Sequence, residues 1–172
     1  MTATKKDLVL AIHPTSRGFG WVVFEGSLAP VDLGVAYAKQ NRHTRLLARF
    51  ERLLNRYEAA VLVLEQFDDK TNTGERIQQF CRAAVDLAQC RGTEVRVLRH
   101  SRVKTCFASM GAVTRMEIAQ AVGQRLEMFR TRLPHVRKRW QSDDGKMGLF
   151  NAAAAAITYF SMDGGQADEQ NQ

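Results

Sequence analysis

Residues 8–25 read LVLAIHPTSRGFGWVVFE, and this stretch decides the fold. The run from Leu8 to Ile12 is apolar throughout, long enough for a strand and too short for a buried helix. A strand that is apolar on both faces belongs to the centre of a sheet that helices cover on each side. Residues 14–20 then contain proline and glycine, and residues 21–24 are a second apolar run. The stretch therefore predicts a β-hairpin with His13 at the tip of its first strand.

The composition is that of an ordinary globular protein. The chain has 172 residues, of which 45% are hydrophobic and 25% are charged, so we expect one domain over residues 1–172 with disordered tails at 1–6 and 162–172. No stretch approaches the length of about 18 apolar residues that a membrane span needs. We therefore expect no membrane partner. The three cysteines have no paired spacing, which favours a reducing, cytoplasmic location.

The charge indicates a polyanionic partner. The net charge is +7, and residues 96–139 contain eleven Lys or Arg residues against only Glu117 and Glu127. A clustered basic excess of this kind is typical of proteins that bind a phosphate backbone. A surface charge that serves only solubility explains the net charge equally well.

The periodicity of the remaining chain predicts alternating strands and helices. After the hairpin we expect a strand at 31–37, a helix at 41–57, a strand at 59–64 that ends in Glu65, a helix at 75–91 and a strand at 94–98. A helical turn at 101–108 and helices at 114–129 and 148–160 follow. This order predicts an α/β fold with a mixed five-stranded sheet, three strands antiparallel and the rest parallel, and helices on both faces.

Four segments resemble the RuvC-like Holliday junction resolvases of the ribonuclease H-like superfamily. They are AIHPTSRGFGWVV (11–23), VLVLEQF (61–67), VRVLRHSRVKTCFASMGAVTRMEIAQAV (95–122) and GLFNAAAAAITYF (148–160). Because they follow the order and spacing of the family from Leu8 to Phe160, the resemblance implies a ribonuclease H-like fold. It also implies hydrolysis of phosphodiester bonds with two divalent ions, Mg²⁺ or Mn²⁺, held by acidic residues.

The acidic positions of the family are only partly kept. Glu65 matches its strand-four glutamate, whereas His13 stands in place of the strand-one aspartate and Asn151 in place of the final-helix aspartate. Gly148 stands three residues before Asn151, where another acid is expected. Asp144 is a further candidate ligand, although Asp143 and Asp144 also fit a solvated charge pair before the last helix.

Two functions therefore stay open. The first is a divalent-metal-dependent endodeoxyribonuclease that cuts branched DNA with Glu65, His13, Asn151 and Asp144. It would prefer Mn²⁺ or another transition metal over Mg²⁺, because an imidazole is softer than a carboxylate. The alternative is a catalytically degenerate homologue that binds branched or duplex nucleic acid without cleaving it. A third interpretation, the related actin-like ATPase and sugar-kinase architecture, rests only on the turn from Gly18 to Gly20 and ranks last.

The resemblance also implies a nucleic-acid surface and a homodimer. Phe67 matches an aromatic residue that the family stacks at a distorted junction, although a core phenylalanine fits equally well. Trp140 is either a base-stacking platform or a packed hinge, and the family's dimer interface would use the helix at 75–91. His100, like His43 and His135, shows no ligand spacing and is interpreted as a surface or loop residue. The predicted phosphate contacts are Arg99, Arg102, Lys104, Arg115, Arg137, Lys138 and Arg139.

Overall fold

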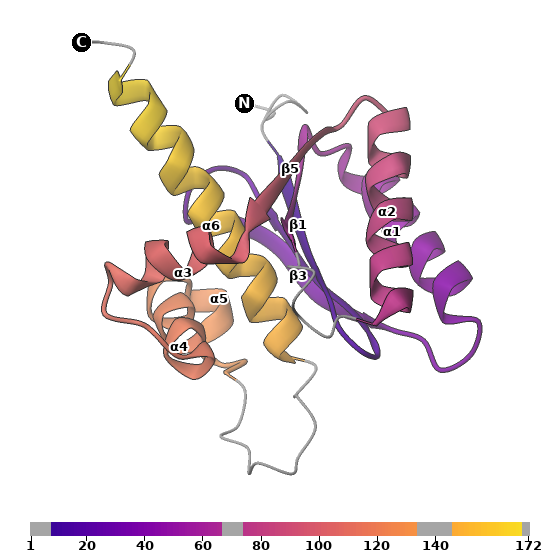
Figure 1. The fold of residues 1–172 in the computed structure, drawn as a ribbon, viewed down its shortest axis with the longest axis horizontal. Helices are drawn as coiled ribbons and strands as arrows, with labels where there is room; N and C mark the ends of the chain where they lie inside the picture. The colour runs from indigo at the N-terminus through magenta and orange to yellow at the C-terminus, as the bar shows by residue number, and fades with distance from the viewer. Residues whose placement is uncertain (1–7, 67–73, 134–145, 170–172) are drawn as a thin grey trace.

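The computed structural model describes residues 8–66, 74–133 and 146–169. Its five strands form one sheet, which runs through the centre of the molecule (Figure 1). The strand order is β3-β2-β1-β4-β5. The strands are β1 (Val9–Pro14), β2 (Gly18–Phe24), β3 (Pro30–Tyr37), β4 (Val61–Gln66) and β5 (Glu94–Arg99). β1 lies in the middle, antiparallel to β2 and parallel to β4. β2 and β3 are antiparallel, and β4 and β5 are parallel, so the predicted mixed sheet is confirmed.

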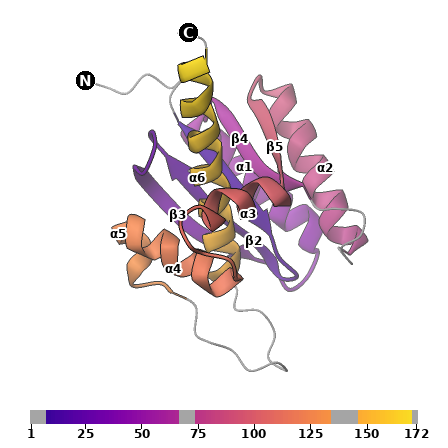
Figure 2. The ribbon, with the colours of Figure 1, turned by 60° about the vertical axis from the view of Figure 1, so that its left-hand side comes forward.

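Helices cover both faces of the sheet, as predicted. They are α1 (Arg42–Tyr57), α2 (Glu75–Cys90), α3 (His100–Ala108), α4 (Arg115–Arg125), α5 (Glu127–Arg130) and α6 (Lys146–Glu169). α1 and α2 lie against one face, and α3 to α6 lie against the other (Figures 1 and 2). None of the helices in the described part of the chain has the length and apolar character that crossing a membrane requires.

The apolar run of β1 is explained by these two layers. Successive side chains of a strand point to opposite faces. Leu10 and Ile12 are fully buried in the core under α1 and α2. Val9 and Ala11 are buried in the second core, which α3 to α6 cover together with the sheet. A strand between two helical layers has no polar face, which is why the run is continuous.

Several element boundaries differ from the sequence-based expectation. β2 begins at Gly18, three residues before the predicted start at Trp21, because its glycines permit close backbone approach and are not turn residues. A Cβ on Gly20 would lie 2.2 Å from the Leu149 nitrogen. The predicted helix at 114–129 is two helices, because Leu126 is extended (φ −119°, ψ 108°) and buried between α4 and α5.

Two further helices are longer than expected. α3 is a helix of nine residues where only a helical turn was predicted. α6 continues to Glu169, beyond the predicted end at residue 160. The assignment of one domain to residues 1–172 stays a prediction.

Candidate functional site

Polar side chains gather at the carboxyl edge of the parallel strands. Ile12 of β1 is paired with Leu64 of β4, so the next residues, His13 and Glu65, reach the same edge side by side. Gln66 is likewise paired with the last residue of β5, so His100, which begins α3, comes to this edge as well. Parallel strands end together, and polar residues that follow them therefore meet.

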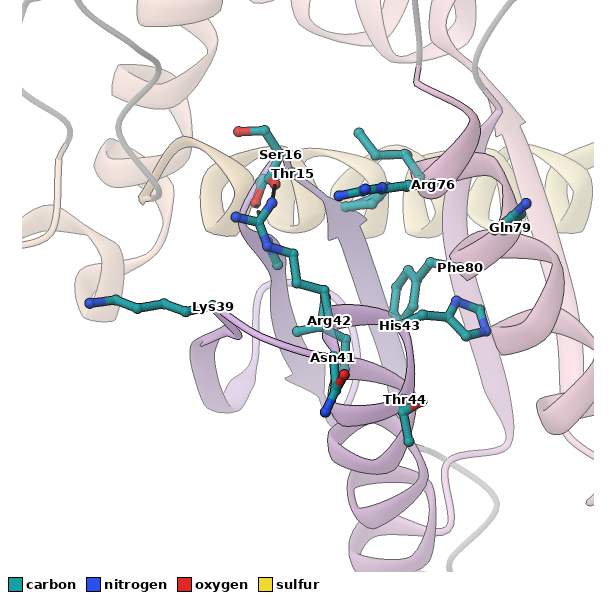
Figure 3. A pocket seen from close by; sticks show the side chains of 14 residues that line it. Thr15, Ser16, Lys39, Asn41, Arg42, His43, Thr44, Arg76, Gln79 and Phe80 are labelled. Carbon is teal, nitrogen blue, oxygen red and sulfur yellow. Dashed lines mark hydrogen bonds between the residues drawn. The ribbon is translucent and has the colours of Figure 1, made fainter.

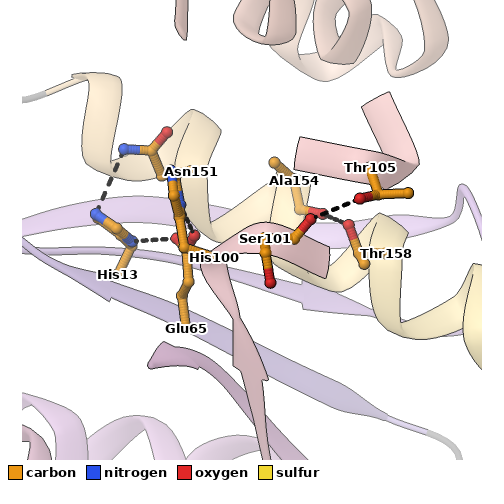
Figure 4. A network of polar contacts seen from close by, with 8 residues as sticks. All are labelled: His13, Glu65, His100, Ser101, Thr105, Asn151, Ala154 and Thr158. Carbon is orange, nitrogen blue, oxygen red and sulfur yellow. Dashed lines mark hydrogen bonds and ion pairs between the residues drawn. The ribbon is translucent and has the colours of Figure 1, made fainter. Parts of the chain in front are cut away.

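α6 adds a fourth residue to the cluster. His13 is paired with Gly20 across the hairpin, and the backbone of Gly148 and Leu149 approaches Gly20 so closely that a Cβ there would lie 2.3 Å from the Gly148 carbonyl carbon. The first turn of α6 therefore lies directly on the hairpin. Asn151, one turn later, faces His13 (Figure 4).

The four side chains form a continuous polar chain, which Figure 4 shows. Nδ1 of His100 is hydrogen-bonded to Oε1 of Glu65. Nδ1 of His13 lies 3.6 Å from Oε2 of the same carboxylate, and Nδ2 of Asn151 lies 3.4 Å from Nε2 of His13. Glu65 is only 6% exposed, so its charge is largely withdrawn from water and depends on these neighbours.

His13 is neutral near physiological pH. Its pKa is lowered from 6.5 to about 4, mainly because the ring is buried, with smaller electrostatic contributions from Arg115 and His100. A neutral imidazole has one donor and one acceptor nitrogen. Because the amide of Asn151 donates, Nε2 accepts and Nδ1 carries the hydrogen, which directs an N–H group toward Glu65.

This donor set does not fit a pair of Mg²⁺ ions. Mg²⁺ prefers hard oxygen ligands, above all carboxylates. The cluster holds one carboxylate, Glu65, and one of its oxygens already accepts the hydrogen bond from His100. Within residues 8–66, 74–133 and 146–162, no group of three or more His, Cys, Asp or Glu side chains could hold a metal ion. Asp144, the other predicted ligand, lies outside the described residues.

Position 148 has no room for the acid that the resemblance implies. A Cβ on Gly148 would lie 2.5 Å from Cγ2 of Thr15, well inside van der Waals contact. The turn that carries Thr15 is fixed, because its N–H donates to the Gly18 carbonyl at 2.8 Å and its Oγ1 accepts from the Gly18 N–H at 3.1 Å. The close approach of α6 to the hairpin thus explains the glycine.

The described part of the predicted nucleic-acid surface lies beside this cluster. Arg99 ends β5, Arg102 and Lys104 lie on α3, and Arg115 begins α4; all four side chains are exposed. Arg115 is close enough to His13 to lower its pKa. The other predicted contacts and ligands lie outside the described residues, namely Phe67, Arg137, Lys138, Arg139, Trp140, Asp143 and Asp144.

Sequence reasoning missed His100. It was interpreted as a surface or loop residue, yet it contacts the buried carboxylate of Glu65. The signal was its position, because His100 directly follows a strand parallel to the one that ends at Glu65 and Gln66. The two polar residues lie at the carboxyl ends of neighbouring parallel strands, where residues of different strands meet.

Comparisons with solved structures agree with the fold. The structure of Thermus thermophilus RuvC matches with a TM-score of 0.67 and 23% sequence identity, covering 92% of this chain and 96% of that chain. T. thermophilus RuvC in complex with a Holliday junction substrate matches with a TM-score of 0.65 and 20% identity, over 92% and 96% of the two chains. A Fowlpox virus resolvase in complex with its substrate Holliday junction DNA has a TM-score of 0.53 and 13% identity, over 90% and 99%.

The sequence comparisons give no assignment. Neither a protein-family model nor a curated protein matches the chain. At the identities of the structural matches the likeness concerns the fold, and the expected fold class is confirmed: the chain has the ribonuclease H-like fold seen in RuvC and in a poxvirus Holliday junction resolvase.

Proposed function

We propose that this protein binds branched DNA as a resolvase-like protein. The observation that carries the proposal is the position of the exposed cations of Arg99, Arg102, Lys104 and Arg115 around the cluster of His13, Glu65, His100 and Asn151. Two of the solved structures with this fold are complexes with Holliday junction DNA, which supports a branched substrate.

The geometry couples the cations to the cluster. α3 begins at His100, which contacts Glu65, and continues through Arg102 and Lys104. α4 begins at Arg115, whose charge acts on His13. Phosphates held by these side chains would therefore bring a strand of DNA past the cluster. Contacts of this type bind the backbone and carry little sequence information.

Binding is tested by titrating a four-way junction, a linear duplex of the same sequence and a single strand. We expect the junction to bind tightest, and the affinity of all three to fall steeply as salt rises, because counterions are released from the phosphates. A protein that binds the linear duplex as tightly as the junction would contradict the preference for branched DNA.

We further propose that the protein is a homodimer and that it is cytoplasmic. A two-fold dimer suits a four-way junction, because each protomer then meets an equivalent strand. The three cysteines are all free, which supports a reducing location. The interface would use α2, and light scattering of wild type and of a charge reversal on the exposed face of α2, Arg82→Glu, tests it. A monomeric wild type, with or without junction DNA, would contradict the dimer.

Cleavage of the bound DNA is a second candidate function. The observation that favours it is the convergence of His13, Glu65 and Asn151, although His13 and Asn151 are 138 positions apart. This version is a divalent-metal-dependent endodeoxyribonuclease in which Asp144 supplies a further ligand. The degenerate version, binding without cleavage, is favoured by the single carboxylate that His100 engages. The geometry of the described residues supports the degenerate version better.

A panel of Mg²⁺ and Mn²⁺ on a branched DNA separates the two versions. Cleavage by wild type that Glu65→Gln abolishes would establish the nuclease, because Gln keeps the shape of Glu65 and removes its charge. Binding without cleavage under either ion would establish the degenerate version. The variant His13→Asp with Asn151→Asp serves as the positive control for cleavage, since it returns carboxylates to the two positions where the family has aspartates.

A further inference from the structure

A pocket of about 450 Å³ lies on the opposite face of the sheet from the cluster. It opens where the turn after β1 meets the first turns of α1 and α2 (Figure 3). Pro14 and Thr15 of its wall directly follow His13 in sequence. Its volume is within the range of about 300–1,000 Å³ that is usual for small-molecule sites. Bare phosphate would leave most of it unfilled.

The charged side chains that line the pocket are all basic. Its described lining includes Lys39, Arg42, Arg76 and His43, and none of those lining residues is acidic. Figure 3 shows the side chains of Arg42 and Arg76 extending toward the same wall, beside Thr15 and Ser16, whereas Lys39 extends away at the rim.

The basic residues at the pocket differ from those at the other end of α1 and α2, where an arginine is paired with a carboxylate. There, Arg91 after α2 forms a 2.5 Å ion pair with Glu51 of α1. At the pocket end, no carboxylate of the described residues is within ion-pair distance of Arg42 or Arg76. Like charges that face one space repel each other, and a bound anion would relieve that repulsion.

The pocket is already ordered for a ligand. Nη1 of Arg42 donates to the Ser16 carbonyl at 3.0 Å, which fixes its guanidinium against the wall and leaves other N–H donors for an anion. The floor is rigid, because Phe80 is 4% exposed and stacks on Phe19 with ring centroids 5.3 Å apart. Thr15, Ser16, Asn41, Thr44 and Gln79 add polar side chains. Ordering before binding lowers the entropic cost of binding.

We propose that this pocket binds a phosphate monoester that carries an organic group, with Arg42 and Arg76 as its anchors. A monoester bears between one and two negative charges at neutral pH and offers several acceptor oxygens, which suits two guanidinium groups. The apolar floor and the volume suit the attached group, such as a nucleoside. The source is either a free nucleotide or the 5′-phosphorylated end of a strand, and the site does not depend on junction binding.

The test compares ligands that differ only in the phosphate. Titration calorimetry measures inorganic phosphate, dAMP and deoxyadenosine, and a second arm compares a short single strand with a 5′-phosphate and with a 5′-hydroxyl. We expect the phosphorylated member of at least one pair to bind about tenfold tighter or more, the size expected from charge-assisted hydrogen bonds. Preference in the first pair alone assigns the free nucleotide, and preference in the second assigns the strand end.

Matched variants locate the effect. Arg42→Gln with Arg76→Gln should remove the preference, whereas Arg49→Gln with Arg52→Gln, which removes the same charge from exposed positions of α1 outside the pocket lining, should keep it. Thermal melting of all variants checks that each is folded. Equal affinity for phosphorylated and unphosphorylated ligands in wild type, or a preference that both double variants lose alike, would overturn the proposal.

Discussion

Nδ1 of His100 is hydrogen-bonded to Oε1 of Glu65, although the two residues lie 35 positions apart. Glu65 is 6% exposed and lies one residue before the end of the buried strand β4, so its carboxylate has lost most of its water. The imidazole of His100 binds one carboxylate oxygen that would otherwise bind water or a cation. This relationship decides how the cluster responds to substitution.

Replacing His100 should destabilise the protein through Glu65. His100→Ala leaves the buried carboxylate with a weaker set of partners, and we expect a loss of about 1 kcal/mol in the free energy of unfolding, since His100 itself is 45% exposed. Urea denaturation measures it. Ser101→Ala, at the next position and exposed, is the control.

A double-mutant cycle ties that loss to the hydrogen bond. In the background Glu65→Gln the carboxylate is gone, and His100→Ala should then cost less than it does in wild type. Equal losses in the two backgrounds would show that His100 stabilises α3 by some other route.

His13 should make the stability depend on pH. Its pKa is about 4 in the folded protein and 6.5 in the unfolded chain, so the unfolded chain binds the additional proton between these values. Stability therefore falls as pH falls through this window, by about 2 kcal/mol between pH 7 and pH 5. Denaturation across that range measures the slope, and His13→Asn should flatten it by the same amount. A variant with the wild-type slope would contradict the lowered pKa.

Much of the fold is readable from periodicity. The runs at 8–12 and 61–64 are apolar because β1 and β4 lie between two helical layers, and the helices that cover them repeat their apolar residues at helical spacing. The break at Leu126 was not readable, because its side chain fits the apolar face of a continuous helix. Burial of that side chain, a tertiary effect, decides the extended backbone there.

Only part of the candidate site could be predicted from the sequence. His13, Glu65 and Asn151 were found because they follow buried runs or match the resolvase pattern, and the structure brings them together. The pairing of His100 with Glu65 depends on strand register, which sequence spacing does not contain. The same holds for Gly148, whose role is a contact with Thr15 across the fold.

Returning carboxylates to the cluster should create a cation site. With His13→Asp and Asn151→Asp, three carboxylates meet at one edge and repel one another, so the variant should melt lower than wild type without divalent ions. Mg²⁺ should then raise its melting temperature more than that of wild type, because a cation binds only the folded variant. Asn151→Asp alone is the control. Equal shifts for wild type and the double variant would contradict the interpretation of His13 and Asn151 as lost ligands.

The cations on α3 should act on affinity uniformly. Arg102→Gln and Lys104→Gln should each weaken junction binding and lower the slope of log affinity against log salt by about 1, since each removes one phosphate contact. Fluorescence titration at several salt concentrations measures the slope, with two junction sequences to test uniformity. Arg52→Gln, an exposed charge on the other face of the sheet, should leave the slope unchanged, and a drop of equal size there would assign the effect to net charge.

Position 148 should reverse its response to alanine when Thr15 loses one methyl group. In wild type, Gly148→Ala places a Cβ 2.5 Å from Cγ2 of Thr15, and we expect a loss of roughly 1–3 kcal/mol from overpacking. Thr15→Ser removes that methyl and keeps the hydroxyl that accepts from the Gly18 N–H. In this background the contact is gone, and the higher helix propensity of alanine, about 1 kcal/mol over glycine, should make Gly148→Ala neutral or stabilising.

Urea denaturation of the four proteins in this cycle measures the reversal. Gly20→Ala is the matched case without relief, because the atoms that its Cβ would meet are backbone atoms of Gly148 and Leu149, the nearest at 2.2 Å. It should stay destabilising with Thr15 or Ser at position 15. If Gly148→Ala costs the same in both backgrounds, the close approach of α6 to the hairpin does not explain why glycine stands where the resolvase pattern has an acid.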